Sequence, residues 1–310
     1  MATQGFEIES NFLTNNNGIS CDEEDTIVLP TKVNDEFATG ISDGLLSGAG
    51  CKNIIIPPSI NTMGSDAFSY NQLTSISIPS SVTSIGEWTF AGNQLTSLSI
   101  PNSVTNIGRS AFNNNKLPDS QAFIYKRNSD GSIDTSTLIS YGGANKNPIT
   151  PNNVITIGYS AFGNIKLDSI TILDSVTTIG EAAFYWSQLT SINIPNSVTT
   201  IGDRVFYGNS LTSINIPDSV ATIGDSAFVN NEITSVSFGS GITNIGSSAF
   251  YGNKLNTVTI PNNITSIGSS AFAGNGVNKN TLDIPRSGIN GWTSGNGGTW
   301  IVSGNNWVKQ

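Results

Sequence analysis

The chain has 310 residues, of which 11% are charged, and its net charge is −9 with an isoelectric point near 4.4. Because no basic face is available for phosphates, the composition argues against nucleic acid as a partner. The sequence contains no histidine, P-loop, dinucleotide fingerprint or metal-ligand spacing, so it predicts no enzyme, no cofactor and no metal site.

Residues 1–50 are predicted to be a polar lead-in followed by a degenerate capping coil. Leu29-Pro30 and Val33 reproduce an I-P-x-x-V pattern that recurs later in the chain. A terminal coil has to cover the open end of a repeat core, so its departure from the pattern is expected. The acidic run at 22–25 is interpreted as a solvated face.

The two cysteines, Cys21 and Cys51, belong to this N-terminal region and to the coil that follows it. Adjacent coils of a stacked β structure lie about 4.8 Å apart, within reach of a disulfide. A disulfide is one interpretation, and two separate small apolar side chains are the other.

Residues 51–285 are built from one repeated unit. Residues 73–94 read LTSISIPSSVTSIGEWTFAGNQ, and the next 22 read LTSLSIPNSVTNIGRSAFNNNK. Copies start at Cys51, Leu73, Leu95, Leu117, Leu167, Leu189, Leu211, Ile233 and Leu255, and the copy at Leu117 is interrupted. A fixed period of this size indicates a solenoid, in which each coil buries its apolar face only against its neighbours.

Within a coil, the alternation in Ile76-Ser77-Ile78 predicts a half-buried strand, which Pro79 ends. Gly86 and its equivalents predict a corner that needs positive φ or close backbone approach. The stretch around Phe90 is too short for an independent helix and predicts a helical or 3₁₀ turn that places Phe in the core. The fold class is therefore a right-handed, β-rich α/β solenoid of 22-residue coils with one long parallel sheet.

The unit LxxIxIPxxVxxIGxxAFxxNx resembles the BspA-like class of leucine-rich repeats, found on bacterial and protist surface proteins. The match covers roughly residues 51–285. The chain differs from the family at one column, where the family often has Cys and this chain has Asn. The column consists of Asn71, Asn93, Asn115, Asn209, Asn231, Asn253 and Asn275, and Ile165 and Ser187 interrupt it. We interpret the column as an internal ladder that satisfies backbone groups at a turn.

The interruption at 118–150 predicts an inserted β-hairpin with a turn at Asn128–Gly131. Insertions in solenoids can serve binding. The hairpin, with Tyr125, Lys126 and Arg127, is therefore either a contact surface or a tolerated decoration.

Two surfaces of the solenoid are candidates for ligand binding. The polar positions of the predicted strands form a ladder of small uncharged groups, which suits a polar ligand but is also typical of any solvated sheet. The polar ligand would be a repeating polar polymer or another strand-rich surface. These strand-face candidates are Ser191, Asn193, Ser213, Asn215, Ser235, Ser237, Thr257 and Thr259.

The second candidate surface follows the Phe column and consists of Tyr185, Trp186, Tyr207 and Tyr251. Rows of exposed aromatic residues are enriched at interfaces and sugar sites, although packing against the coil edge explains them equally well.

One acidic column, Glu181, Asp203 and Asp225, falls on three successive coils. It could recruit a cation, but we interpret each acid as an acceptor for backbone donors at the start of its own turn.

Residues 286–310 are predicted to form a C-terminal cap, in which a hairpin bearing Trp292, Trp300 and Trp307 covers the end of the Phe column. Sugar stacking by these Trp residues is the alternative.

The resemblance implies a non-enzymatic surface or secreted protein that adheres to host matrix proteins or other cells. A carbohydrate-binding module using the aromatic residues is the alternative. We expect a monomer with a protein or glycan ligand and no membrane insertion. Residues 1–20 show no apolar signal core, so no signal or anchor is recognised in this chain.

Overall fold

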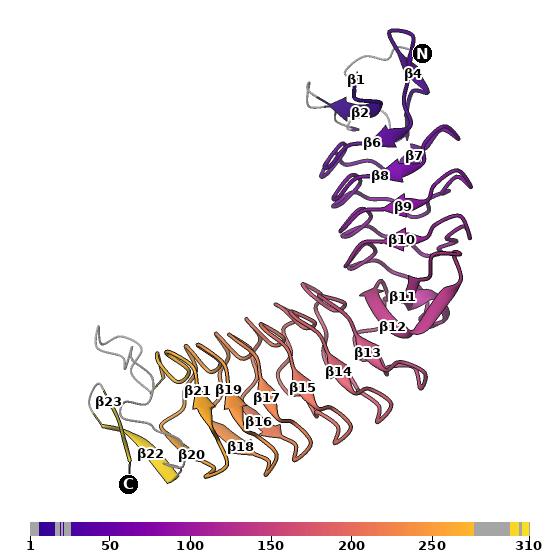
Figure 1. The fold of residues 1–310 in the computed structure, drawn as a ribbon. Helices are drawn as coiled ribbons and strands as arrows, with labels where there is room; N and C mark the ends of the chain where they lie inside the picture. Colours follow the sequence, from indigo (N-terminus) through magenta and orange to yellow (C-terminus); the bar gives the residue numbers. More distant parts are fainter. Residues whose placement is uncertain are drawn as a thin grey trace. The chain divides into compact units, whose positions relative to one another are not determined.

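The computed structural model describes residues 6–15, 19, 21, 26–275, 298–303 and 306–309, with side chains up to residue 275. The chain divides into two compact units, Met1–Asn145 and Lys146–Gln310. The sequence predicts no boundary between 145 and 146. Both units are stacks of 22-residue coils, so the predicted leucine-rich-repeat solenoid is confirmed (Figure 1).

A parallel ladder joins the coils of each unit. In most coils it lies just before the glycine that recurs at the same position of each repeat. In the first unit the strand order is β1 (Phe6–Glu9), β2 (Phe12–Asn15), β6 (Gly40–Ile41), β8 (Thr62–Met63), β9 (Ser84–Ile85) and β10 (Asn106–Ile107), with β1 and β2 antiparallel. In the second unit it is β13 (Thr156–Ile157), β14 (Thr178–Ile179), β15 (Thr200–Ile201), β17 (Thr222–Ile223), β19 (Asn244–Ile245) and β21 (Ser266–Ile267).

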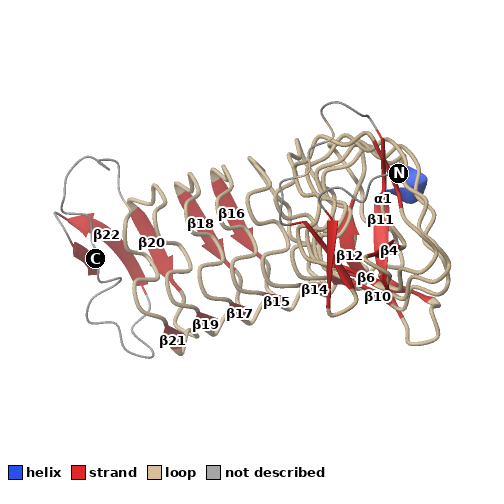
Figure 2. Cartoon of the chain, turned by 90° about the horizontal axis from the view of Figure 1, so that it is seen from above, coloured by secondary structure: helices blue, strands red, loops and turns tan. Residues whose placement is uncertain are grey.

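The predicted parallel pairing of coils is therefore present, but the continuous ladder lies away from the L-x-x-I-x-I stretch. That stretch forms strands only in some coils. They are β3 (Thr26–Val28) with β7 (Asn53–Ile55), β16 (Ser213–Ile216) with β18 (Ser235–Phe238), and β20 (Thr257–Ile260). In the second unit the two rows of strands lie on opposite sides of the coils (Figure 2).

Close approach at the glycine column explains where the ladder runs. A Cβ on Gly86 would lie 2.6 Å from the carbonyl carbon of Gly64 and from the backbone nitrogen of Ser65. Gly86 and its column equivalents lie outside the residues with positive φ, so close approach, and not a left-handed conformation, requires glycine here. The backbones of neighbouring coils can approach closely at this column because glycine has no Cβ, and the ladder runs beside it.

The prediction of a helical turn before each Phe is wrong. In the coil starting at Leu73, Trp88 (φ 56°) and Gly92 (φ 69°) are left-handed. The backbone N–H groups of Trp88, Phe90 and Gly92 donate to carbonyls of the following coil at 3.2, 2.8 and 2.9 Å. A helix would direct these donors into its own coil, whereas the stack satisfies them between coils.

The core is the predicted stack of apolar columns. Phe rings of successive coils stack at centroid distances of 5.0–5.5 Å. In the first unit they are Phe68, Phe90 and Phe112, and in the second Phe162, Phe184, Phe206, Phe228, Phe250 and Phe272, all fully buried.

The insertion folds as an antiparallel pair, β11 (Phe123–Arg127) with β12 (Ile133–Tyr141), preceded by the single turn α1 (Asp119–Ala122). Besides the antiparallel pair β1 and β2, the described residues form two further hairpins. They are β4 (Lys32–Val33) with β5 (Glu36–Phe37), and β22 (Gly298–Ser303) with β23 (Asn306–Lys309). Strand β22 pairs antiparallel with β20, so the outer edge of β20 is covered.

Of the predicted C-terminal cap, the backbone of Trp300 and Trp307 lies in β22 and β23, and Trp292 lies outside the described residues. The acidic run at 22–25 also lies outside them.

Candidate functional site

The predicted strand face has its best-ordered part on β16 and β18. Their parallel register places Ser213 beside Ser235 and Asn215 beside Ser237. Side chains alternate between the two faces of a strand. All four of these side chains are exposed, while the residues between them are buried in β16 and partly covered in β18. The structure thus brings these four candidates together as one patch, named here the strand-face patch.

The other strand-face candidates extend this patch less regularly. Ser191 and Asn193 are exposed, on an extended segment that belongs to no strand ladder. Thr257 and Thr259 are exposed on β20, which lies in register with Thr299 and Ile301 of β22.

Hydrogen-bonding groups of the strand-face patch are available, in contrast to the hydroxyls of a Thr column in the same unit. The Oγ1 atoms of Thr243 and Thr265 donate to a carbonyl of the preceding coil at 3.2 and 3.0 Å. No hydrogen bond joins the side chains of Ser213, Asn215, Ser235 and Ser237 to other residues in the described part of the chain. Their donors and acceptors face solvent.

Three of the four predicted aromatic residues form a cluster. The rings of Tyr185 and Tyr207 stack at 5.1 Å, and Trp186 lies 6.4 Å from each of them. Trp186 is 49% exposed. Tyr251 is 41% exposed but stands apart, because the intervening coil carries the buried Val229 in this column.

Sequence reasoning missed Tyr70, which is 58% exposed in the first unit. Its ring lies over Gly92, as the ring of Trp186 lies over Gly208, since a Cβ on either glycine would come within 2.7 Å of the ring. A glycine 22 residues after an aromatic residue was the available signal.

The acidic column has structural partners. Glu181 pairs with Arg204 at 3.2 Å. The Oδ1 atom of Asp203 accepts a hydrogen bond from the backbone N–H of Asp225 at 2.8 Å, and that of Asp225 accepts one from Ser247 at 2.6 Å. The acids therefore accept donors of the following coil, and not of their own turn as predicted. The described residues contain no group of three metal-ligating side chains.

Cys21 and Cys51 form a disulfide, with their Cα atoms 4.9 Å apart. Of the three hairpin residues proposed as a contact, Lys126 is exposed, and Tyr125 and Arg127 are half-buried.

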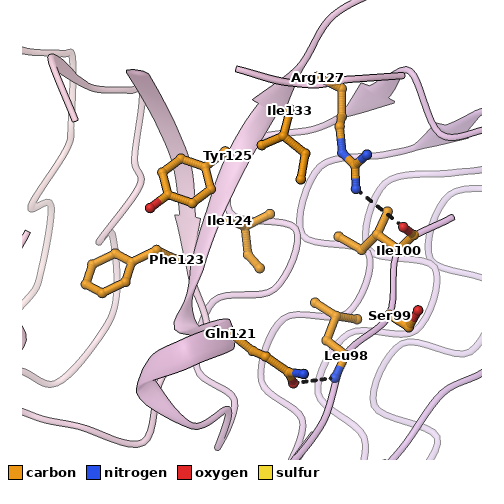
Figure 3. A pocket seen from close by; sticks show the side chains of 9 residues that line it. All are labelled: Leu98, Ser99, Ile100, Gln121, Phe123, Ile124, Tyr125, Arg127 and Ile133. Carbon is orange, nitrogen blue, oxygen red and sulfur yellow. Dashed lines mark hydrogen bonds between the residues drawn. The ribbon is translucent and has the colours of Figure 1, made fainter. Parts of the chain in front are cut away.

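A groove of about 300 Å³ separates β11 from the segment 98–100 of the preceding coil (Figure 3). Two side chains bridge it. The backbone N–H of Leu98 donates to Gln121 Oε1 at 2.9 Å, and Arg127 Nη2 donates to the carbonyl of Ile100 at 3.4 Å. The groove is lined by Leu98, Ser99, Ile100, Gln121, Phe123, Ile124, Tyr125, Arg127 and Ile133. Sequence analysis missed it, although an insertion directly after a coil removes that coil's normal neighbour.

A model of the BspA type leucine rich repeat region matches residues 20–124 and 155–278, in six copies. No curated protein matches the chain.

Several solved structures are similar to the chain. A leucine-rich repeat protein from Eubacterium ventriosum is 22% identical, with a TM-score of 0.58 over 85% of this chain and 80% of that one. A leucine rich cell surface protein from Faecalibacterium prausnitzii is 21% identical over 78% and 92% of the chains, with a TM-score of 0.41. The pneumococcal vaccine antigen PcpA is 18% identical over 87% and 93%, with a TM-score of 0.45. Of these three, only the first is similar enough to support the fold.

Proposed function

The chain belongs to the BspA-type leucine-rich repeat family, whose members are typically binding proteins. We propose that it is a non-enzymatic interaction protein that is displayed on a cell surface or secreted. Its ligand would be a protein of the host matrix or of a neighbouring cell, held on the strand face. The observation that carries this proposal is the strand-face patch of four exposed side chains in parallel register, none of them hydrogen-bonded within the described chain.

The chemistry of the patch favours a protein ligand. Small uncharged donors and acceptors lose little conformational entropy on binding, and they can pair with the main chain and polar side chains of a partner. A regular row of such groups, one coil after another, gives an extended contact with no deep pocket. Specific protein interfaces are extended surfaces, while small-molecule sites are concave.

An extracellular location is supported by the disulfide between Cys21 and Cys51, because such bonds persist in oxidising compartments. Among the described residues, no helix has the length and apolar character needed to cross a bilayer. We propose a monomer, since pairing with β22 covers the outer edge of β20, where a second chain could otherwise add a strand.

The proposal is tested by probing an array of matrix proteins and glycans with the wild-type chain and three variants. Ser213→Arg with Asn215→Arg alters the strand-face patch. Asn196→Arg with Asn262→Arg adds the same charge at two exposed residues outside the strands and serves as the control. Loss of protein binding in the first variant alone supports the proposal. Binding of the protein ligand that is equally strong in the strand-face variant and in the control variant contradicts the proposal.

The third variant tests the alternative, a carbohydrate-binding module. The specific observation in its favour is the stacking of Tyr185 on Tyr207 beside the exposed Trp186, a flat aromatic surface of the kind that sugars stack on. Tyr185→Ala, Tyr207→Ala and Tyr251→Ala are combined. Binding to a glycan, lost only in this variant, would replace the strand-face proposal by the alternative.

A further inference from the structure

The groove beside the insertion interrupts the regular stacking of coils. In an unbroken stack, the segment 98–100 would face the equivalent segment of the next coil, 22 residues later. Here β11 stands in that place, and side chains span the gap instead of backbone groups (Figure 3). Strand β11 pairs with β12 along one edge only, so its other edge faces the groove.

Main-chain groups are available in the segment 98–100, on one wall of the groove. The described chain shows no hydrogen bond to the backbone of Ser99, between the two bridged residues Leu98 and Ile100. The free main-chain groups of Ser99 favour an extended peptide, which pairs with extended segments through its own backbone.

The floor of the groove is aliphatic. Ile124 and Ile133 point toward Leu98 and Ile100 across the gap (Figure 3). Ile133 is 52% exposed, and Leu98 and Ile100 are half-buried, so an entering apolar side chain would remove apolar surface from water on both walls.

Arg127 supplies the only charge among the lining residues. Its Nη1 donates to the carbonyl of Gly131 at 2.7 Å and its Nη2 to Ile100 at 3.4 Å, and no carboxylate of the described chain pairs with it. Burial lowers the pKa of this guanidinium from its usual value, with no acidic neighbour to oppose the shift. A half-buried cation that lacks a counter-ion favours an anionic partner.

We propose that this groove binds an extended acidic segment of a protein ligand, with an aliphatic side chain over Leu98 and Ile133 and a carboxylate against Arg127. The long bond from Arg127 to Ile100 is exchanged for a charge-assisted bond to the carboxylate, which is the stronger interaction. This inference rests on the proposed protein-binding function and adds a second contact to it, with a defined chemistry.

The test is calorimetric titration of the full chain with a blocked seven-residue peptide that has Leu-Asp-Leu at its centre. The matched peptide carries Leu-Asn-Leu, and free 4-methylpentanoate serves as the small acid. We expect the Asp peptide to bind about tenfold more tightly than the Asn peptide, the factor that one charge-assisted bond supplies. Equal binding of the two peptides, no binding of either, or equally tight binding of the free acid would overturn the proposal.

Protein variants locate the binding. Arg127→Gln is expected to weaken binding of the Asp peptide about tenfold. Lys126→Gln, which removes an exposed charge on the same strand, is expected to leave the affinity within about twofold. Because Arg127 also holds the hairpin turn, Ile133→Glu is the second variant. It places a carboxylate in the groove beside an intact Arg127 and is expected to abolish binding while the circular dichroism spectrum stays that of the wild type. Unchanged affinity in both groove variants would overturn the proposal.

The strand-face variant separates this result from the proposed function. Ser213→Arg with Asn215→Arg should bind the peptide as the wild type does. If the peptide does not bind but the chain still binds proteins of the array, only the groove proposal is refuted. If array binding is lost while the peptide still binds, only the strand-face proposal is refuted.

Discussion

The backbone N–H of Leu211 donates to the side-chain oxygen of Asn231, twenty residues later, at 3.1 Å. The amide nitrogen of Asn231 returns bonds to the carbonyls of Phe206 at 2.8 Å and Phe228 at 3.2 Å. One buried side chain thus joins two coils at the turn after Phe228. The same arrangement recurs at Asn71, Asn93, Asn115, Asn253 and Asn275.

Replacing Asn231 by Ala should destabilise the chain by about 3 kcal/mol, because a buried donor and buried acceptors lose their partner at a side chain only 1% exposed. Asn231→Ser should cost less, since Ser187 in the same column keeps a bond to the carbonyl of Phe162 at 2.7 Å. Urea unfolding measures both, with the exposed Asn262→Ala as the control. Equal stability of all three variants would show that the ladder adds nothing.

Gly208 is the next position where a small change should be costly. It has φ 69°, and a Cβ there would lie 2.7 Å from the Trp186 ring. Gly48 has φ 68° with open space around it, so Gly48→Ala measures the left-handed backbone alone, about 1 kcal/mol. Gly208→Ala should cost more than this and also change the Trp fluorescence, since the ring must move. A fluorescence spectrum identical to that of the wild type would contradict the contact.

The disulfide is expected to stabilise the N-terminal end of the solenoid. It closes a separation of 30 residues, for which the unfolded chain loses entropy worth about 3.6 kcal/mol. Reductant should lower the free energy of unfolding of the wild type by this amount. It should leave the free energy of unfolding of the double variant, Cys21→Ser with Cys51→Ser, unchanged. Detection of two free thiols in the unreduced, denatured protein would refute the bond.

The repeat period made most of the fold predictable. Columns of Phe, Ile and Val 22 residues apart identify the core directly, and the insertion shows as a break in the same period. The turn before Phe90 could not be predicted in this way. Its donors are satisfied between coils, by Arg109, Ala111 and Asn113, and a local pattern within one coil carries no information about bonds to the next.

The candidate surfaces were predictable only in part. Alternation along the strands correctly indicated which side chains of 213–216 and 235–238 are exposed, but not which coils have paired strands. The groove depends on where β11 lies against residues 98–100, a tertiary contact that no spacing in the sequence reveals.

Acid should weaken the contact between the coils that carry Asp218 and Ser240. The Asp218 carboxylate accepts hydrogen bonds from the backbone N–H of Ser240 at 2.6 Å and from its hydroxyl at 3.0 Å. These bonds, the backbone bond first, lower the pKa of Asp218 below its usual value. Because the native state favours the ionised form, this stabilisation is complete above the unfolded-state pKa of about 4 and is lost as the pH falls through the lower native pKa.

Asp218→Asn should therefore be less stable than the wild type at pH 7. The difference should shrink as the pH falls below about 4, where the carboxyl of the unfolded wild type is protonated first and that of the native state at still lower pH. Urea unfolding across this pH range measures the effect. Asp168→Asn, at an exposed position in the same kind of coil, is the control for a general charge effect. The opposite result is that the free energies of unfolding of the Asp218 variant and the wild type differ by the same amount down to pH 2. That result would show that ionisation of Asp218 does not contribute to stability.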